Sequence, residues 1–351
     1  MRDLPAIRAR FAVVIASVAV LVLAGIVVGS VWSDAAAPTQ HRTQVESITG
    51  NGTVTIEYDS ASGDSNRAVV DGVDPGLSSA ANGWAIVERS ALPPALQAVS
   101  RTPDSGVVGF GEWALVGSNT NATVSIGQTT LTVVVPEGRD VDPSRKAGFL
   151  RQFLDPYELD SETSERVVLV ASPAELTHEG AMYGDDRGYV TIEAFWDGDV
   201  GSVWIHEYIH ARQNFQLGTE MAWFREASAE YLSYRVLEEQ YAEVTESDVR
   251  DRLTAFPDHE GVTLANQTTW RDTSADYHVG ARLLAAVDAE IRADTDGEHT
   301  LFDVFRAMNR HDGRVSVANF VELVEQRTGE DESWIEAAIR GDRPAEMWPS
   351  Q

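Results

Sequence analysis

The architecture of this 351-residue chain is decided at residues 204–210, which read Trp204-Ile205-His206-Glu207-Tyr208-Ile209-His210. Successive residues of an α-helix turn by about 100°, so His206 and His210 lie one turn apart on the same face. Two imidazoles at that spacing can bind one metal ion, and the Glu207 carboxylate beside them can reach an adjacent water molecule. The flanking residues are apolar, which predicts a core helix with only its histidine face open to a cleft.

A third metal ligand is expected from the segment that follows this helix. We predict that the first helix runs up to a stop at Gly218 and that the chain then returns as a second helix. With about seven helical residues on either side of the turn, the second helix would place Glu226 opposite His210. One turn later, Glu230 would accept the N–H of the other ring nitrogen of His206. Two histidines, one glutamate and an open fourth position are the composition of a catalytic zinc site.

The returning segment, residues 223–231, reads Trp-Phe-x-Glu-Ala-x-Ala-Glu-Tyr. Together with His-Glu-x-x-His it resembles the gluzincin metallopeptidases, whose second motif is Trp-Leu-x-Glu-Gly-x-Ala-Glu-Tyr. The residues that match this second motif are Trp223, Glu226, Ala229, Glu230 and Tyr231. The resemblance implies a mostly helical, thermolysin-like zinc metallopeptidase domain. The alternative is a buried helix whose histidines bond only to the backbone.

An uncharged apolar run at residues 11–32 predicts a transmembrane anchor. A helix of this length reaches about 33 Å, which is enough to cross the hydrocarbon core of a bilayer. Arginines precede the run and Asp34 follows it, so residues 1–10 are expected in the cytoplasm and the remainder outside the cell. The alternative is a cleaved signal peptide with Ala35-Ala36-Ala37 as the processing site. An intramembrane protease is not expected, because the sequence has no second run of about 20 apolar residues.

Composition limits the class of partner. Acidic residues outnumber basic ones by 55 to 27, which gives a formal net charge of −28. Such a surface repels itself at low ionic strength, so we expect a halophilic source; the alternative is an acidic protein that docks onto a basic partner. The same charge argues against nucleic acid as a ligand. The chain has no cysteine, so it has neither disulfides nor thiolates that would compete for zinc.

The remaining sequence divides into a β-rich part and a helical part. Residues 33–45 are expected to form a linker, and residues 46–141 a small antiparallel β domain rich in β-branched residues and glycine. From residue 142 to about residue 345 helical periodicity dominates, which predicts the metallopeptidase domain. The fold class is therefore α+β. Candidate strands of the β domain are Gly52–Tyr58, Val107–Val116 and Ala122–Val135.

The segment before the first helix of the site bears on substrate recognition. A loop, Gly-Ala-Met-Tyr-Gly, is expected at residues 180–184 and a strand at residues 188–195. In the aminopeptidase N branch of the gluzincins, Gly-Ala-Met-Glu-Asn occupies this interval, and its glutamate holds the free amine of the substrate. Tyr183 and Gly184 replace that Glu and Asn here, so aminopeptidase and endopeptidase activity both stay open. We expect the strand to be an edge strand along which a peptide can lie in extended form.

A candidate oxyanion donor lies further along the chain, at the head of a predicted helix. In the aminopeptidase N branch a Tyr-x-x-Gly at such a position supplies the hydroxyl that stabilises the oxyanion, and this chain matches at Tyr277 and Gly280. The alternatives are a merely packed tyrosine and the neighbouring His278, since a histidine performs this task in another gluzincin branch. His178 and His259 have no partner at ligand spacing and are expected at the surface.

These observations together predict a membrane-anchored, externally facing zinc metallopeptidase that cleaves peptides or proteins. Zn²⁺ would be held by His206, His210 and Glu226, with Glu230 behind His206. Glu207 would act as general base toward the attacking water. The rival interpretation is a catalytically inactive protein of the same fold that serves as an envelope binding module.

Overall fold

The computed structural model of the protein describes residues 43–60, 63–99, 105–159, 165–184, 186–192, 200–257 and 259–341. Sheets and helices both contribute to this part of the chain, which confirms the predicted α+β class. The predicted cytoplasmic residues 1–10, the anchor at 11–32 and the alternative processing site lie outside the described residues. Among the helices of the described part, none is both long enough and apolar enough to cross a bilayer.

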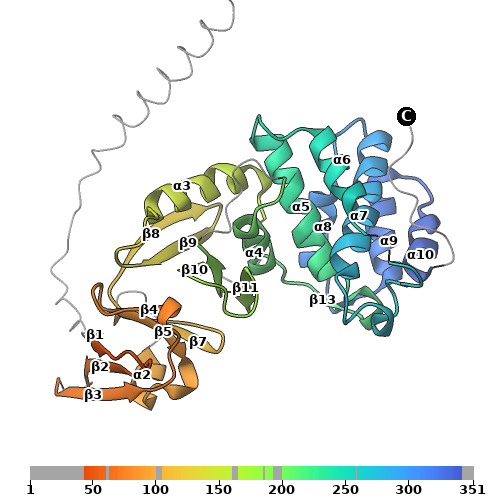
Figure 1. Cartoon of the computed structure of the whole chain (residues 1–351). Helices are drawn as coiled ribbons and strands as arrows, with labels where there is room; N and C mark the ends of the chain where they lie inside the picture. The colour runs from red at the N-terminus through yellow and green to blue at the C-terminus, as the bar shows by residue number, and fades with distance from the viewer. Residues whose placement is uncertain are drawn as a thin grey trace, which may run out of the picture. The chain divides into compact units, whose positions relative to one another are not determined.

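Two small antiparallel sheets form the N-terminal part of the described chain (Figure 1). The strands of the first are, in spatial order, β1 Thr43–Ile48, β2 Val54–Asp59 and β3 Ser65–Val70. Those of the second are, in spatial order, β4 Ser78–Ser79, β5 Trp84–Glu88, β7 Trp113–Gly117 and β6 Val107–Phe110. Three short helices occur between these strands: η1 Pro75–Leu77, η2 Arg89–Ala91 and α2 Pro94–Val99. Buried side chains of both sheets share one apolar core, so the predicted antiparallel β part is confirmed.

Two of the predicted long strands are hairpins instead. The segment expected as one strand from 107 to 116 turns back at Gly111, and the segment expected from 122 to 135 turns back at Gly127. Both glycines have positive φ, 55° and 54°, in loops of two residues. Such loops match the twist of paired strands and favour glycine, whereas hydrophobic pattern alone does not show where a strand reverses.

A five-stranded sheet with the order β11-β12-β10-β9-β8 lies behind the site. Its three inner strands, β9 Thr129–Pro136, β10 Arg166–Ser172 and β12 Arg187–Thr191, are parallel, and the outer strands β8 Asn119–Ile126 and β11 Gly180–Tyr183 are antiparallel to them. Helix α3, Pro143–Leu154, packs against one face, and the Asp142 side chain caps its N-terminus. Strands β8 and β9 belong to this sheet, so the sheet spans the boundary predicted near residue 141.

The edge strand next to the site is not the one predicted. Residues 180–183, expected as a loop, form the edge strand β11, and β12 is an inner strand that ends at Thr191. The two strands approach closely because Gly188 has no side chain, and a Cβ there would lie 2.5 Å from the carbonyl oxygen of Ala181. Residues 193–199, where the predicted strand was to end, lie outside the described residues.

The histidines lie on helix α4, Val203–Ala211, which is shorter than predicted. Instead of continuing toward Gly218, the chain leaves the helix at Arg212 and pairs as the short strand β13, Gln216–Leu217, with β14, Arg314–Val315. The Asn309 side chain stabilises this departure, because it donates to the carbonyl of Arg212 and accepts from the N–H of Asn214 at 2.8 Å each. Because Asn309 is far from Arg212 in the sequence, the residues around Arg212 do not indicate that the helix ends there.

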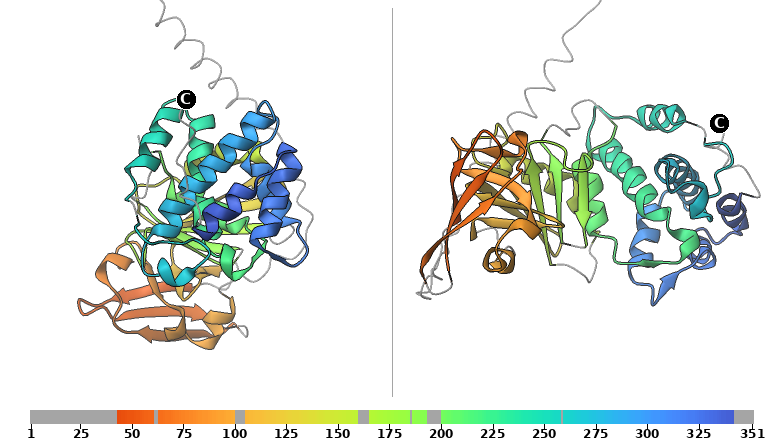
Figure 2. Two further views of the ribbon diagram at one scale, coloured as in Figure 1. Left: turned by 90° about the vertical axis from the view of Figure 1, so that its right-hand side faces the viewer. Right: turned by 60° about the horizontal axis from the view of Figure 1, so that its bottom comes forward.

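Helices make up the rest of the described chain, coloured from green to blue in Figure 2. Helix α4 packs between strands β11 and β12 on one side and α5 on the other (Figure 1). Thr300 and Ser316, residue types that favour helix N-caps, begin α8 and α9 with capping boxes. The remaining elements are η4 Asp155–Tyr157, η5 Thr219–Met221, α5 Phe224–Gln240, α6 Glu246–Ala255, η6 Gln267–Thr269, α7 Ala275–Asp294, α8 Leu301–Asn309, α9 Val317–Thr328 and α10 Ser333–Arg340.

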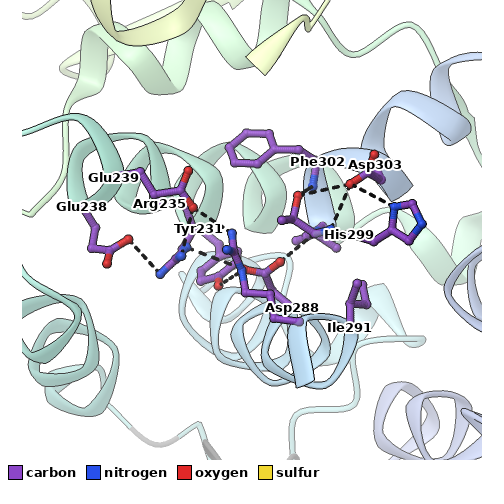
Figure 3. Close-up of polar contacts among 12 residues, drawn as sticks. Tyr231, Arg235, Glu238, Glu239, Asp288, Ile291, His299, Phe302 and Asp303 are labelled. Atoms are coloured by element: carbon purple, nitrogen blue, oxygen red, sulfur yellow. Dashed lines mark hydrogen bonds and ion pairs between the residues drawn. The ribbon is translucent and has the colours of Figure 1, made fainter. Parts of the chain in front are cut away.

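One buried carboxylate joins α5, α7 and α8 (Figure 3). Asp288, 2% exposed, accepts hydrogen bonds from the Tyr231 hydroxyl at 2.8 Å and from Arg292 Nε at 3.0 Å. Its other oxygen accepts from the backbone N–H of Leu301 at 2.6 Å, at the start of α8. Arg235 Nε lies 3.6 Å away. The network ties α5 to α7, the two helices that bring residues to the site from outside α4.

Candidate metal centre

The side chains of His206, His210 and Glu226 converge on one point between α4 and α5. The Nε2 atoms of the two histidines are 3.0 Å apart, and Glu226 Oε2 lies 3.0 Å from that of His210 and 3.5 Å from that of His206. Within the described ranges, this is the one group of three potential ligand side chains whose donor atoms all lie within 4.8 Å of one another. Three donors placed in this way can bind a single metal ion.

Glu226 reaches this point by a different route from the predicted one. Because α4 ends at Ala211 and α5 begins only at Phe224, Glu226 lies in the first turn of the second helix and not at its middle. The N-terminus of a helix carries partial positive charge, which favours a carboxylate there. Trp223, fully buried just before α5, anchors this start in the core. The prediction of two helical segments of equal length on either side of the turn was therefore wrong, although the Glu226 carboxylate does lie beside His210.

The outer nitrogen of His206 faces Glu230, the residue expected behind it. Glu230 Oε2 lies 3.2 Å from His206 Nδ1. Burial lowers the pKa of His206, but hydrogen bonds to Glu226 and Glu230 outweigh burial and raise the pKa to about 10. The surroundings of this ring thus favour positive charge, as a cation site requires.

His210 has an outer partner that the sequence analysis missed. Its Nδ1 lies 3.0 Å from Gln213 Oε1, and the amide nitrogen of Gln213 donates to the Arg225 carbonyl at 2.7 Å and to Ser228 Oγ at 3.0 Å. An oxygen acceptor at Nδ1 selects the tautomer whose Nε2 lone pair points to the metal. The available signal was the three-residue spacing from His210 to Gln213, which the overlong helix prediction obscured.

Glu207 is buried, 5% exposed, and one of its oxygens has no partner. The carboxylate accepts a hydrogen bond from the backbone N–H of Met182 on β11, while Oε2 has none within the described part of the chain. Burial raises the pKa of the Glu207 carboxyl, and the two histidines of α4 act in the opposite direction. The β11 backbone packs directly on this side chain, because a Cβ at Gly180 would lie 2.8 Å from Glu207 Oε1. A buried oxygen without a partner calls for a ligand or water.

A cavity of about 520 Å³ opens beside the site. Its walls include His206, Glu207, Gly180, Tyr234 and Tyr277, so it connects the two α4 residues with the edge strand on one side and with α5 and α7 on the other. Pockets of this size hold small ligands or parts of a peptide.

Tyr277 lies in the first turn of α7 and faces the ligands. Its ring is nearly parallel to that of His206, at 6° and a centroid distance of 5.9 Å, and its hydroxyl bonds to the Glu226 carboxylate. Burial, and after it the charge of Glu226, raises the pKa of the Tyr277 phenol, so the hydroxyl remains a donor. The ring comes this close because Gly280 packs against α5, with its missing Cβ only 2.6 Å from the Cβ of Ala227.

The other histidines have different surroundings. His278 stacks on Phe256 at 4.3 Å, and its Nδ1 lies 3.0 Å from Nε2 of His259. His259, expected to lack a partner, therefore has one, because a loop before α7 brings it back over that helix. His178 is exposed, as expected, and lines the cavity beside the site.

The donor set fits a zinc ion. It consists of two imidazole nitrogens and one carboxylate oxygen, each histidine is held from behind by an oxygen, and the cavity leaves one side open. Structural zinc sites are closed by four protein ligands, whereas catalytic ones keep one position for water or substrate.

Comparison with known proteins identifies the fold. No family model and no curated protein matches the sequence. An aminopeptidase N family protein from Idiomarina loihiensis superimposes with a TM-score of 0.52 and 13% identity, over 65% of this chain and 47% of its own. A two-domain M1 zinc metallopeptidase variant bound to L-arginine gives 0.48 and 16%, over 68% and 55%.

A variant of the M1 zinc metallopeptidase from Deinococcus radiodurans, bound to a Tyr-Ser-Ala substrate, gives a TM-score of 0.48 and 14% identity, over 88% of each chain. This chain spans about half the length of the first two of these proteins. By its fold the described chain is similar to the Idiomarina loihiensis aminopeptidase N family protein, a distant likeness that agrees with the fold expected from the two motifs.

Proposed function

We propose that this protein is a zinc-dependent metallopeptidase. The observation that carries the proposal is the convergence of His206, His210 and Glu226 next to Glu207 Oε2, a buried oxygen without a partner in the described chain. A purely structural site would have no reason to keep a buried carboxylate oxygen bare at the wall of a cavity. The gluzincin-like fold supports the same conclusion.

The residues of the site have separate tasks in this proposal. A zinc ion held by the two histidines and Glu226 supplies a Lewis acid that polarises a peptide carbonyl and lowers the pKa of a water molecule. Glu207 accepts the proton of the attacking water and delivers it to the leaving amine. The N–H of Met182 holds one Glu207 oxygen, so the other is directed toward the reacting atoms.

Tyr277 is proposed to stabilise the oxyanion. Its phenol keeps its proton at neutral pH because burial and the Glu226 charge raise its pKa, and a protonated hydroxyl at the cavity wall can donate to developing negative charge. A donor of this kind commonly lowers the barrier by about 3 kcal/mol. In the family pattern a lysine stands where Val279 is found, so Tyr277 would act here without that neighbour.

The substrate is proposed to be a peptide in extended conformation. Strand β11 pairs with β12 along one edge, and no strand in the described part of the chain pairs with its other edge. Free N–H and C=O groups of an edge strand can bind a peptide by main-chain hydrogen bonds. Because Tyr183 and Gly184 replace the amine-binding Glu-Asn, a comparison of free and N-acetylated peptides is needed to distinguish aminopeptidase from endopeptidase activity.

The decisive test uses two variants. Glu207→Gln should keep stoichiometric zinc and lose peptide hydrolysis, whereas His210→Ala should lose the metal. Both are to be assayed in high salt because of the net charge of −28. A wild-type protein that holds zinc but cleaves no peptide would favour the rival function, a non-catalytic binding module. Full activity of Glu207→Gln would contradict the proposed general base.

The proposed location rests on sequence alone. Residues 11–32 would anchor the chain in the cell membrane, with the N-terminus in the cytoplasm and the peptidase outside. The test is protease treatment of intact cells. Digestion of the domain without lysis is expected, and protection until lysis would contradict this orientation.

A further inference from the structure

A row of three side chains on α5 leads away from the metal centre. Glu226, Glu230 and Tyr234 follow one another at intervals of four residues, so they share one face of the helix. Tyr234 is 1% exposed, and its hydroxyl donates to Glu230 Oε1. The other oxygen of Glu230 faces His206 Nδ1 at 3.2 Å. The two oxygens of one carboxylate therefore link a buried phenol to an imidazole of the site.

This arrangement has a counterpart at the second histidine. Gln213 holds His210 with its amide oxygen, while its amide nitrogen is fixed by the Arg225 carbonyl and Ser228 Oγ. In both cases the group behind the histidine is itself held at its second polar atom. A carboxylate held at only one oxygen could rotate about the bond to its side chain, and the ring it supports could turn with it. The hydrogen bond from Tyr234 removes that freedom from Glu230.

The surroundings of Tyr234 hold its hydroxyl in place. The ring packs where the chain enters α4, since a Cβ at Gly201 would lie 3.0 Å from Tyr234 Cε1. Arg252 Nε, from α6, donates to the phenol oxygen at 3.5 Å. Gly201 before α4, Glu230 on α5 and Arg252 on α6 thus fix the position of the Tyr234 hydroxyl. A tyrosine that only filled the core would not need its hydroxyl to be held in this way.

We propose that Tyr234 is a positioning residue for the metal centre, acting on His206 through Glu230. This inference rests on the proposed zinc site. Partners behind a ligand typically alter metal affinity by about 10- to 100-fold when they are removed, and Tyr234 acts one bond further out. Loss of its hydroxyl should therefore weaken zinc binding by about 3- to 10-fold, without unfolding the protein.

The matched control is Tyr231, a second buried tyrosine on α5 whose hydroxyl also donates to a carboxylate, Asp288, but outside the metal centre. Zinc affinity is measured by competition with a chelator for wild type, Tyr234→Phe, Tyr231→Phe, Glu230→Ala and Tyr234→Phe in the Glu230→Ala background. Thermal unfolding of the metal-free proteins verifies that each variant folds.

We expect weaker zinc binding for Tyr234→Phe, wild-type affinity for Tyr231→Phe, and no further loss when Tyr234→Phe is added to Glu230→Ala. Wild-type affinity for Tyr234→Phe would overturn the inference and leave the zinc site intact. An equal loss in the Glu230→Ala background would overturn the route through Glu230. A wild-type protein that binds no zinc would instead overturn the proposed function.

Discussion

Tyr277 and His206 stack with nearly parallel rings, although one begins α7 and the other lies within α4. The contact brings the hydroxyl of Tyr277 to Glu226, which lies on a third helix, α5. Tyr277 and His206 therefore form one wall of the site. Helices α5 and α7 can present Glu226 and Tyr277 together because of the close packing at Gly280 and the buried Asp288 network.

Tyr277→Phe tests the role of this hydroxyl. The ring stack should persist, and with zinc supplied in excess the site should stay filled although Glu226 loses the hydrogen bond from the phenol. The turnover number of the zinc-loaded variant should fall about 100-fold for the loss of one oxyanion donor. The measurement is kcat on a peptide substrate alongside metal analysis. If kcat stays at the wild-type value, the tyrosine serves only for packing.

Gly180→Ala tests the contact between the edge strand and the general base. An added methyl would lie 2.7 Å from Val203 Cγ1 and 2.8 Å from Glu207 Oε1, so the carboxylate must shift. We expect at least a tenfold loss of kcat with zinc retained, because misplacement of a catalytic group by about 1 Å can cost 100-fold.

Gly148→Ala in α3 is the control for that substitution, since a Cβ there meets nothing within 4 Å. It should leave kcat unchanged. Comparable activity of the two alanine variants would show that Glu207 does not depend on the strand for its position.

Asp288→Asn tests the network of Figure 3. Removal of the charge takes the buried carboxylate away from Arg235 and Arg292, which keep only the more exposed Glu239 as a shared partner. The free energy of unfolding should fall by about 3 kcal/mol. Urea unfolding at constant m-value is the measurement. Glu336→Gln, which breaks an exposed ion pair with Arg340, should change stability by less than about 1 kcal/mol. Equal effects would contradict the role of burial.

Lys146 predicts a pH dependence of stability. Burial, assisted by the charge of Arg145, lowers the pKa of this lysine from 10.5 to about 7. Below pH 7 the ammonium is charged in both states and its burial cost is complete; between about pH 7 and 10.5 only the unfolded state holds the proton, so stability rises with pH. Lys146→Met should therefore stabilise the protein by about 2–4 kcal/mol at pH 6 and much less at pH 10.

The measurement for Lys146 is the difference in unfolding free energy between variant and wild type at the two pH values, which cancels other titrating groups. Arg151→Met, an exposed residue of the same helix, should show a small difference that does not vary with pH. A constant gain for Lys146→Met from pH 6 to 10 would show that the lysine titrates normally.

Sequence patterns predicted the parts of the site that depend on local periodicity. The four-residue spacings from His206 to His210 and from Glu226 to Glu230 fix which side chains share a helix face. The caps at Asp142, Thr300 and Ser316 are equally local, because a side chain bonds to a backbone group two or three residues on.

The errors of prediction beside the site involve long-range partners. Nothing near Arg212 indicates that Asn309 will satisfy its carbonyl and end α4, so Gln213 was placed within a helix and not behind His210. Strand β11 likewise exists only because β12 lies beside it and Gly188 permits the approach. A four-residue strand has too little pattern of its own to be distinguished from a loop.

The backbone N–H of Met182 ties strand β11 to the Glu207 carboxylate. Strand β11, whose free edge we propose as the site of peptide binding, also donates this N–H to Glu207, the proposed general base. Substitutions in β11 that are meant to change which peptides bind should therefore also change the rate of hydrolysis.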